Sequence, residues 1–271
     1  MKTQACQKLF LYLALPCEAK PIVDRYRLKK DINLHAFAVY SNDAICLTVT
    51  GIGKTAMAAG LAYTQALFSP NSYPIMLNIG IAGHKNHSVG SVFVIDKITD
   101  ADTERRFYPP LVYKPPCLSN SLVTVSKPQA TYPNESLCDM EASAFYETAT
   151  RFTTSELIQC VKIVSDNEAS PAQNIQPKMV SELIAEHLST IEKVLFELTV
   201  LQKSIAEQEM PDFESILQQY RFSFAEQAQL KKLLSRHRLI NNQDSFDFAA
   251  KTGKEYLNAL KQYLEQSEFY L

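Results

Sequence analysis

Three acidic residues in this sequence lie beside or within apolar segments, where carboxyl groups can carry out acid–base chemistry. Glu18 follows the apolar run of residues 9–15, Glu141 lies within "CDMEASAFY", and Asp166 ends "KIVSD". A protonated carboxyl can act as a general acid, and an ionised one can act as a base, when burial or neighbouring charges separate their pKa values. Taken singly, each acid would also fit a solvated turn or a helix cap, since Glu18 is close to Lys20 and Asp166 precedes further polar residues.

The stretch "QKLFLYLALPCEAKPIV", which carries Glu18, has two incompatible interpretations. Lysines precede the seven apolar residues 9–15, which is the order found in an export signal. Such a signal needs small residues before its cleavage site, whereas Leu15 and Pro16 precede Cys17 here. A short apolar run that a proline ends is typical of a fully buried parallel strand. We therefore expect a strand that delivers Glu18 to a site.

The segment "TVTGIGKT", residues 48–55, ends like a phosphate-binding loop between a strand and a helix. Thr48 occupies the place of the first glycine of that motif. A β-branched residue there does not suit a backbone that must curl around phosphate. The segment is therefore interpreted as a glycine-containing turn that seats a helix on a sheet, and nucleotide hydrolysis is not expected.

Strand-like and helical patterns alternate over the first two thirds of the chain. Six of the seven glycines lie between positions 51 and 90, and tight turns of this kind are where an α/β fold approaches a ligand. The predicted strands are 9–15, 34–40, 44–50, 74–80, 91–98, 121–126 and 159–165, and the predicted helices between them are 54–68 and 141–152. This alternation predicts an α/β sheet with helices on its faces. The aromatic residues expected in its core include Phe145, Tyr146 and Phe152.

From about residue 176 the pattern becomes purely helical. Apolar residues recur at intervals of three and four, which predicts one long amphipathic helix that closes the α/β domain. They are Val180, Leu183, Ile184, His187, Leu188, Ile191, Val194, Leu195 and Leu198. We expect an α/β domain over residues 1–202 and a helical C-terminal extension over residues 203–271.

Two helices are predicted in the extension. One begins at Ser223, with Glu226 three residues on as a capping box, and the other spans about 244–267. Basic residues cluster on the first of these helices, at Lys231, Lys232, Arg236 and Arg238. Residues 201–271 carry nine basic and ten acidic side chains, so we expect a solvated helix face and no nucleic-acid binding.

Charge and cysteine content exclude several classes of protein. The formal net charge of −2 gives no general attraction to nucleic acid or anionic membrane. The six cysteines, at 6, 17, 46, 117, 138 and 160, show no metal-ligand spacing, and the pair His84 and His87 has no nearby acid or cysteine cluster. No apolar run approaches the roughly 20 residues that span a bilayer. We expect a soluble cytoplasmic protein with reduced thiols, no metal and no cofactor, in which the two histidines contribute only loop polarity.

Five segments, taken in order, resemble the nucleoside phosphorylase and nucleosidase superfamily. They are "ALPCEAKPI", "TGIGKTAMAAG", "NIGIAGH", "CDMEASAFY" and "KIVSDNEAS". The resemblance covers roughly residues 10–200 and is greatest to methylthioadenosine/S-adenosylhomocysteine nucleosidases and similar purine nucleoside hydrolases. It implies a central mixed sheet flanked by helices, a purine nucleoside as the small-molecule partner, and a homodimer. The C-terminal extension lies outside it.

The resemblance also implies roles for particular residues. Glu18 would orient and activate the attacking water, and Asp166, with Ser165 beside it, would protonate the purine as it leaves. Glu141 would accept hydrogen bonds from the ribose hydroxyls, and Met140 would contact the apolar face of the sugar. Glu141 should be ionised for this task, and a place at the start of a helix would favour its charge.

These residue types suit cleavage of an N-glycosidic bond, because positive charge develops on the sugar and negative charge on the base. Phosphorylases of the superfamily hold phosphate with a Gly-Asp-Pro-x-Arg loop and a second arginine. This chain has "LPCEAK" at the first place and Asn78 at the second. A glutamate repels a phosphate dianion, so hydrolysis is favoured over phosphorolysis.

The sequence departs from the pattern of the family at several positions of the site. Ile81, expected to contact substrate, replaces a small hydroxyl residue, and Lys162 replaces an arginine near the acid. The segment 125–137, expected to border the base, is short, and Gln129 or Tyr132 could contact the base there. A phosphorylase, or a catalytically silent nucleoside-binding protein that acts through its helical tail, remains an alternative.

Overall fold

The protein, seen in a computed structural model, is described over residues 9–68, 73–128, 135–207, 211–240 and 250–266. The chain divides into two compact units, unit 1 (Met1–Ala206) and unit 2 (Glu207–Leu271). Each unit has hydrophobic side chains buried in a core of its own.

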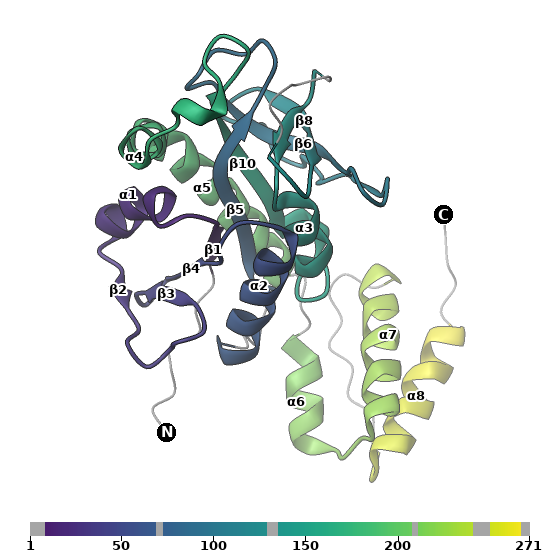
Figure 1. The fold of residues 1–271 in the computed structure, drawn as a ribbon. Coiled ribbons are helices and arrows are strands. Elements are labelled where there is room, and N and C mark those ends of the chain that lie inside the picture. Colours follow the sequence, from purple (N-terminus) through teal and green to yellow (C-terminus); the bar gives the residue numbers. More distant parts are fainter. Residues whose placement is uncertain (1–8, 69–72, 129–134, 208–210, 241–249, 267–271) are drawn as a thin grey trace. The chain divides into compact units, whose positions relative to one another are not determined.

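One mixed ten-stranded sheet forms the centre of the described part of unit 1 (Figure 1). Its strands are β1 (Leu9–Leu13), β2 (Lys29–Lys30), β3 (Ala38–Ser41), β4 (Ile45–Val49), β5 (Ile75–Gly83), β6 (Val92–Asp100), β7 (Arg106–Phe107), β8 (Ser119–Thr124), β9 (Leu137–Asp139) and β10 (Ile158–Asp166). The seven strands that the sequence predicted are all present, with ends that differ by a few residues. The three that it missed, β2, β7 and β9, have only two or three residues each.

Helices flank this sheet, as the sequence predicted. They are α1 (Pro16–Tyr26), α2 (Lys54–Phe68), α3 (Ala142–Ala149), α4 (Pro177–Glu186) and α5 (Leu188–Glu207), with 3₁₀ turns at Ser155–Leu157 and Ala172–Asn174. The helix predicted over 54–68 has those same ends in α2.

The buried strand β1 has a neighbour on each side, because β4 and β5 both pair with it in parallel. Strand β10 continues the sheet in parallel beyond β5, and β6 then runs antiparallel to β10. Strands β6, β8 and β9 follow in parallel order, and β9 returns to β5 through the pair Gly83 and Cys138. Five strands therefore close on themselves, while β1, β4, β3 and β2 extend as an open sheet.

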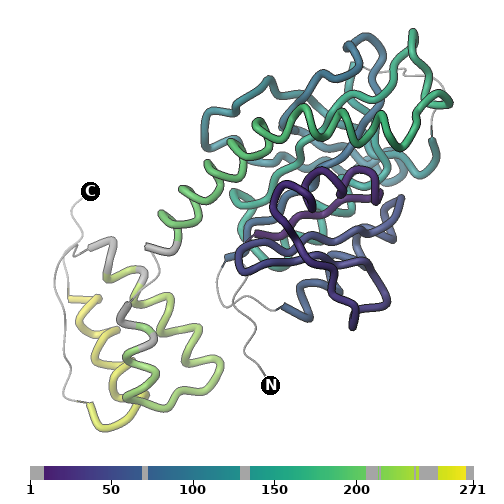
Figure 2. Tube along the Cα trace, turned by 90° about the vertical axis from the view of Figure 1, so that its left-hand side faces the viewer, coloured from purple at the N-terminus to yellow at the C-terminus, as the bar shows by residue number. Residues whose placement is uncertain are grey.

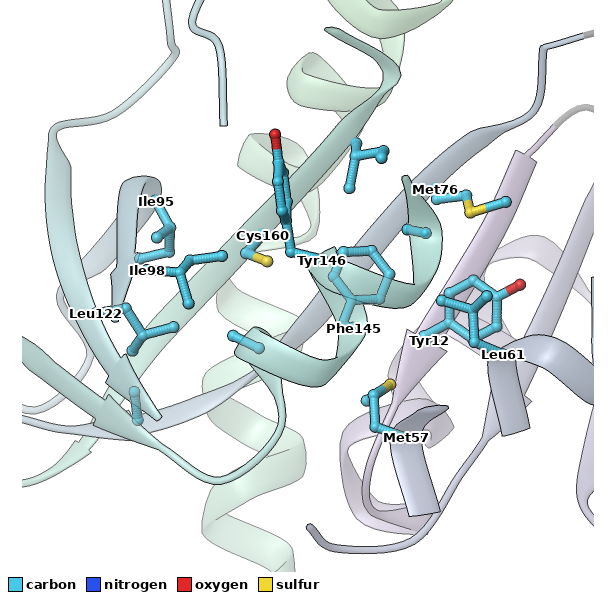
Figure 3. Close-up of a cluster of buried hydrophobic side chains, with 14 of the residues drawn as sticks. Tyr12, Met57, Leu61, Met76, Ile95, Ile98, Leu122, Phe145, Tyr146 and Cys160 are labelled. Carbon is cyan, nitrogen blue, oxygen red and sulfur yellow. The ribbon is translucent and has the colours of Figure 1, made fainter. Parts of the chain in front are cut away.

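Both faces of the sheet are buried. Alternate residues of β1 point to opposite faces, so Phe10 and Tyr12 belong to one core cluster and Leu11 and Leu13 to the other. On the first face Tyr12 meets side chains of α2 and α3, among them Met57, Leu61 and Phe145 (Figure 3). Helices α1, α4 and α5 supply the helical side chains of the second cluster. A parallel strand that is buried on both faces has a nearly continuous apolar sequence. Residues 9–15 resemble an export signal for this reason.

Helix α1, which the sequence did not predict, contains a proline. Pro21 has no N–H group to donate to the carbonyl of Cys17, four residues earlier. The hydroxyl of Ser181 in α4 donates to that carbonyl at 2.7 Å instead. The contact between the two helices therefore satisfies a part-buried acceptor that the proline leaves without a partner in its own helix.

Two predictions about helices are wrong. The helix expected from residue 176 onward is two helices, because His187 leaves helical geometry and its Nε2 donates to the carbonyl of Gly90 at 2.6 Å. Helix α3 ends at Ala149, and Phe152, expected in the core, is 40% exposed. Phe145 and Tyr146 are buried as expected.

Unit 2 consists, in its described part, of α6 (Pro211–Gln219), α7 (Phe224–Ile240) and α8 (Gly253–Gln266) (Figure 2). Ser223 and Glu226 form the predicted capping box, and α6 was not predicted. Residues 244–249 of the last predicted helix, and the side chain of Arg238, lie outside the described residues. The basic side chains of Lys231, Lys232 and Arg236 are exposed, as expected of a solvated face. No helix in the described parts of either unit is long and apolar enough to cross a membrane.

Candidate active site

A cavity of about 170 Å³ lies beside the carboxyl ends of the parallel strands β1, β5 and β10. This edge is where α/β sheets usually bind their ligands. Residues at or just after the ends of these strands line the cavity, together with Met140 and Glu141 directly before α3. All six residues that the sequence predicted for the site line it: Glu18, Ile81, Met140, Glu141, Ser165 and Asp166.

Glu18 lies in the first turn of α1 and is only 2% exposed. Its Oε2 accepts hydrogen bonds from the backbone N–H groups of Ala14 (3.1 Å) and Leu15 (2.8 Å), and its Oε1 accepts one from Ile81 (2.9 Å). Burial raises the pKa of this carboxyl above its usual value, and the Ile81 hydrogen bond and the charge of Lys162 offset only part of that rise. The Glu18 side chain thus connects the ends of β1 and β5, and three backbone N–H groups hold its carboxylate in place.

Lys162 of β10 and Asp139 of β9 form a buried ion pair close to Glu18 and Glu141. Lys162 Nζ is 2.9 Å from Asp139 Oδ2, and the two side chains are 2% and 0% exposed. Burial alone would lower the pKa of Lys162, but the charges of Asp139 and Glu141 outweigh it and raise the pKa above its usual value. Lys162 therefore remains a cation, and it partly offsets the acids around it.

Glu18 and Lys162 approach each other above Gly80 of β5. A Cβ atom on Gly80 would lie 2.9 Å from Glu18 Oε1 and 3.4 Å from Lys162 Nζ. Glycine in the middle of a strand is unfavourable unless another group must come close. Here the missing side chain leaves room for the carboxylate.

Glu141 immediately precedes α3 and also faces the cavity. Its Oε1 accepts a hydrogen bond from the backbone N–H of Gly53, at 2.8 Å. Burial and the charge of Asp139 raise the pKa of Glu141 to about 7, while Lys162 and the Gly53 N–H act in the opposite direction. Burial and the charge of Asp139 therefore oppose the ionisation of Glu141 that the sequence analysis expected.

Asp166 is the last residue of β10, where the strand has an irregular register. Val164 pairs with Ala82 and Asp166 with Gly83, so Ser165 is an extra residue in β10. Such bulges redirect side chains next to active sites. The Ser165 hydroxyl donates to Asp166 Oδ1, and burial raises the pKa of Asp166 to about 6. Burial thus shifts the pKa of Asp166 in the direction that a general acid near neutral pH needs.

Apolar groups form much of the remaining wall of the cavity. Ile81 and Met140 are half-buried and line it, together with Val125 and Pro128 at the start of the segment that the sequence placed beside the base. Gln129 and Tyr132 lie outside the described residues.

No basic side chain lines the cavity within the described part of the chain. Asn78, at the position of a family arginine, is buried and donates from Nδ2 to the carbonyl of Tyr12 at 3.0 Å. Among the described residues, no cluster of three metal-ligating side chains occurs. Among the described residues, the cavity therefore offers no basic side chain that could bind a polyanion.

His84, expected to contribute loop polarity, is instead buried, with 3% of its surface exposed. Its Nδ1 accepts from the backbone N–H groups of Asn86 and His87, at 3.0 and 2.9 Å. Its Nε2 is 2.9 Å from the carbonyl of Glu135. The ring therefore connects the segment after β5 to the segment before β9.

Asp139 is the residue of the site that sequence reasoning missed, and its pairing with Lys162, which was placed near the acid, was not predicted. A lysine inside the apolar run "QCVKIVS" was the available signal, since a charged side chain in a buried strand requires a partner. The partner belongs to a three-residue strand about twenty positions away, and spacing alone does not reveal it.

The chemistry available to this arrangement follows from its protonation states. Asp166 and Glu141 have raised pKa values close to neutrality, and Glu18 is fixed by backbone donors at one end of the same cavity. Pairs of carboxyls with distinct environments are typical of acid–base catalysis on a neutral, polar substrate.

The fold of this chain is similar to that of several solved structures. No model of a known protein family matches the sequence, and no curated protein matches it either. Among solved structures, the chain is similar to 5′-methylthioadenosine/S-adenosylhomocysteine nucleosidase from Helicobacter pylori (TM-score 0.56, 11% identity, 70% of this chain and 98% of that one). It is also similar to 5′-methylthioadenosine nucleosidase from Arabidopsis thaliana (TM-score 0.56, 15% identity, 71% and 96%) and to a futalosine hydrolase mutant from Helicobacter pylori (TM-score 0.54, 11% identity, 70% and 99%).

Proposed function

We propose, from the nucleoside phosphorylase and nucleosidase fold that this chain has, that it hydrolyses the N-glycosidic bond of a purine nucleoside or a 5′-modified purine nucleoside. The observation that carries the proposal is the convergence of Glu18, Glu141 and Asp166 on one cavity at the carboxyl ends of β1, β5 and β10. The similar solved proteins include nucleosidases and a hydrolase of futalosine, which supports the same class of reaction.

In this proposal Glu141 and Met140 hold the sugar. Ionised Glu141 accepts hydrogen bonds from the ribose hydroxyls, while Gly53 N–H keeps Oε1 in place at 2.8 Å. Met140 offers its apolar side chain to the sugar face. The bonds from the hydroxyls strengthen as the sugar becomes cationic, so they favour the transition state over the bound substrate.

Glu18 accepts a proton from the attacking water. A carboxylate has about four lone-pair positions, and three backbone N–H groups occupy three of them. The remaining position can accept from water, and the fixed side chain avoids the entropy cost of orienting a mobile base. The water oxygen bonds to the anomeric carbon as the bond from that carbon to the base nitrogen breaks.

Asp166 supplies the proton that the departing base requires. Its raised pKa keeps a useful fraction protonated, and the hydroxyl of Ser165 fixes the orientation of Oδ1. The proton passes to a ring nitrogen, so the base leaves neutral. Free base and free sugar are the products, and the scheme uses no cofactor or metal.

Water, and not phosphate, suits this cavity. Glu18 and Glu141 would repel a phosphate dianion, and Lys162 is buried in its pair with Asp139. Phosphorolysis normally needs cationic donors at the nucleophile. The family resemblance further leads us to expect a homodimer, and the cysteine pattern leads us to expect a cytoplasmic protein.

The test is release of free base from a panel of purine nucleosides that differ in their 5′ groups, with and without phosphate. We expect free base and free sugar at a rate that phosphate does not change. Ribose 1-phosphate among the products would favour the phosphorylase, and binding without turnover across the panel would favour the silent nucleoside-binding protein.

A further inference from the structure

A cluster of charged and hydroxyl side chains lies beside the cavity but does not line it. Its centre is Asp100, the last residue of β6, which is 6% exposed. Lys54 Nζ lies 2.9 Å from Asp100 Oδ2 and also pairs with Asp102 at 2.5 Å. A largely buried charge is costly unless its hydrogen bonds are satisfied, so a cluster of this kind indicates a specific role.

The carboxylate of Asp100 is fully engaged by its neighbours. Oδ2 accepts from the Ser143 hydroxyl at 2.6 Å as well as from Lys54. Oδ1 accepts from the backbone N–H groups of Asp102 and Thr103, at 3.1 and 3.0 Å. Burial alone would raise the pKa of Asp100, but the bonds from Ser143 and Lys54 hold it below its usual value, so the group is a permanent anion near neutral pH.

The cluster joins three segments that line the cavity. Lys54 directly follows Gly53, whose N–H donates to Glu141. Ser143 lies in the first turn of α3, two residues after Glu141. Asp102 accepts from the hydroxyl of Ser126, which adjoins the cavity residue Val125.

We propose that Asp100 and Lys54 are positioning residues, which hold the Gly53 turn and the start of α3 at the separation that lets Glu141 receive the ribose hydroxyls. Lys54 fixes the turn, Ser143 fixes the helix, and Asp100 bonds to both. The inference rests on the proposed function, since it assigns the ribose to Glu141. Outer partners of this kind typically contribute about 10- to 100-fold to a site that they orient.

The consequence specific to this role is a loss of discrimination between sugars. Binding of adenosine and of 2′,3′-dideoxyadenosine should be measured by calorimetry in the Glu18→Gln background, in which we expect no hydrolysis, for the otherwise unchanged chain and with Asp100→Asn, Ser143→Ala or Glu141→Gln added. We expect Asp100→Asn to weaken adenosine binding about tenfold or more and to leave the dideoxy compound nearly unchanged. Ser143→Ala removes a single donor and should act in the same direction to a smaller extent. In the Glu141→Gln background, Asp100→Asn should add little further loss.

A matched control is Glu147→Gln. Glu147 of α3 pairs with Arg105 near the surface, so this variant removes an ion pair between the same loop and the same helix without touching Asp100. In the same Glu18→Gln background, we expect it to leave the binding of both compounds unchanged. Thermal melting of each variant separates lost folding from lost recognition.

Equal weakening of both compounds by Asp100→Asn and Ser143→Ala, or no weakening of either, would overturn the positioning role. Additive losses in the double variant with Glu141→Gln would do so too. Absence of base release by the wild type would count against the proposed hydrolysis, while the ratio of the two binding constants would still decide this inference.

Discussion

At the scale of single residues, the carboxyl groups of the cavity make different demands on pH. Glu141 must be ionised to accept from the ribose, and its pKa is raised to about 7. Asp166 must be protonated to act as an acid, and its pKa is raised to about 6. Glu141, which must be ionised, therefore has a higher pKa than Asp166, which must be protonated, so only a minority of molecules hold both groups in the required state at any pH.

This order predicts a narrow bell-shaped dependence of kcat/KM on pH. kcat/KM should be greatest between about pH 6 and about pH 7, the two pKa values, and should fall on either side, because Glu141 gains a proton at lower pH and Asp166 loses one at higher pH. A profile of initial rates from pH 4 to pH 10 measures it. Asp166→Asn should remove the alkaline limb. A plateau extending well above pH 8 in the wild type would show that Asp166 is not the acid.

A second prediction concerns the leaving group. Asp166→Asn should lower kcat/KM about 10²- to 10⁴-fold for a purine nucleoside, whose base needs a proton. It should cost much less for a nitrophenyl riboside, because that group departs without protonation. Glu141→Gln should affect both substrates alike, since both contain the ribose hydroxyls. Equal losses on the two substrates for Asp166→Asn would assign Asp166 a binding or structural task.

The positions of these acids could be predicted because each lies in a short segment with a recognisable order along the chain. The ion pair between Lys162 and Asp139 was not predicted, since it joins β10 to β9 and depends on tertiary structure. The raised pKa of Glu141 was not predicted either. Its main causes are burial and the charge of Asp139, which spacing in the sequence does not reveal.

At the scale of elements, a glycine at position 80 of strand β5 leaves room for the carboxylate of Glu18. A Cβ atom at Gly80 would come within 2.9 Å of Glu18 Oε1. Gly80→Ala should therefore displace the carboxylate and lower kcat/KM on the order of 10²-fold, as expected for a misplacement of about 1 Å. Rates and melting temperatures should be compared with the wild type. Full activity in a well-folded Gly80→Ala protein would mean that Glu18 need not occupy its observed position.

The spacing of apolar residues along the sequence predicted helix α2 with both of its ends. It failed where a tertiary hydrogen bond replaces a local one. No helix was predicted at α1, where the Ser181 hydroxyl of α4 donates to the carbonyl that Pro21 leaves without a donor. His187 likewise interrupts a continuous amphipathic pattern through its bond to Gly90.

At the scale of the whole molecule, the two units have separate cores, and the described residues that line the cavity all belong to unit 1. A chain that ends at Glu207, the last residue of α5, should therefore fold and release base with the kcat/KM of the full chain. Steady-state rates and thermal melting of the two forms measure this. A large loss of activity in a truncated chain that melts normally would assign part of the site to the extension.

The central claim is that Glu18 activates water in the cavity, and Glu18→Gln tests it most directly. The amide keeps the shape of the side chain but cannot take a proton, so release of free base from a purine nucleoside should be abolished while the melting temperature is retained. Asp24→Asn is the matched control, because Asp24 lies on the same helix in an exposed pair with Lys20 and should leave the rate unchanged. Turnover of Glu18→Gln at the wild-type rate would contradict the claim.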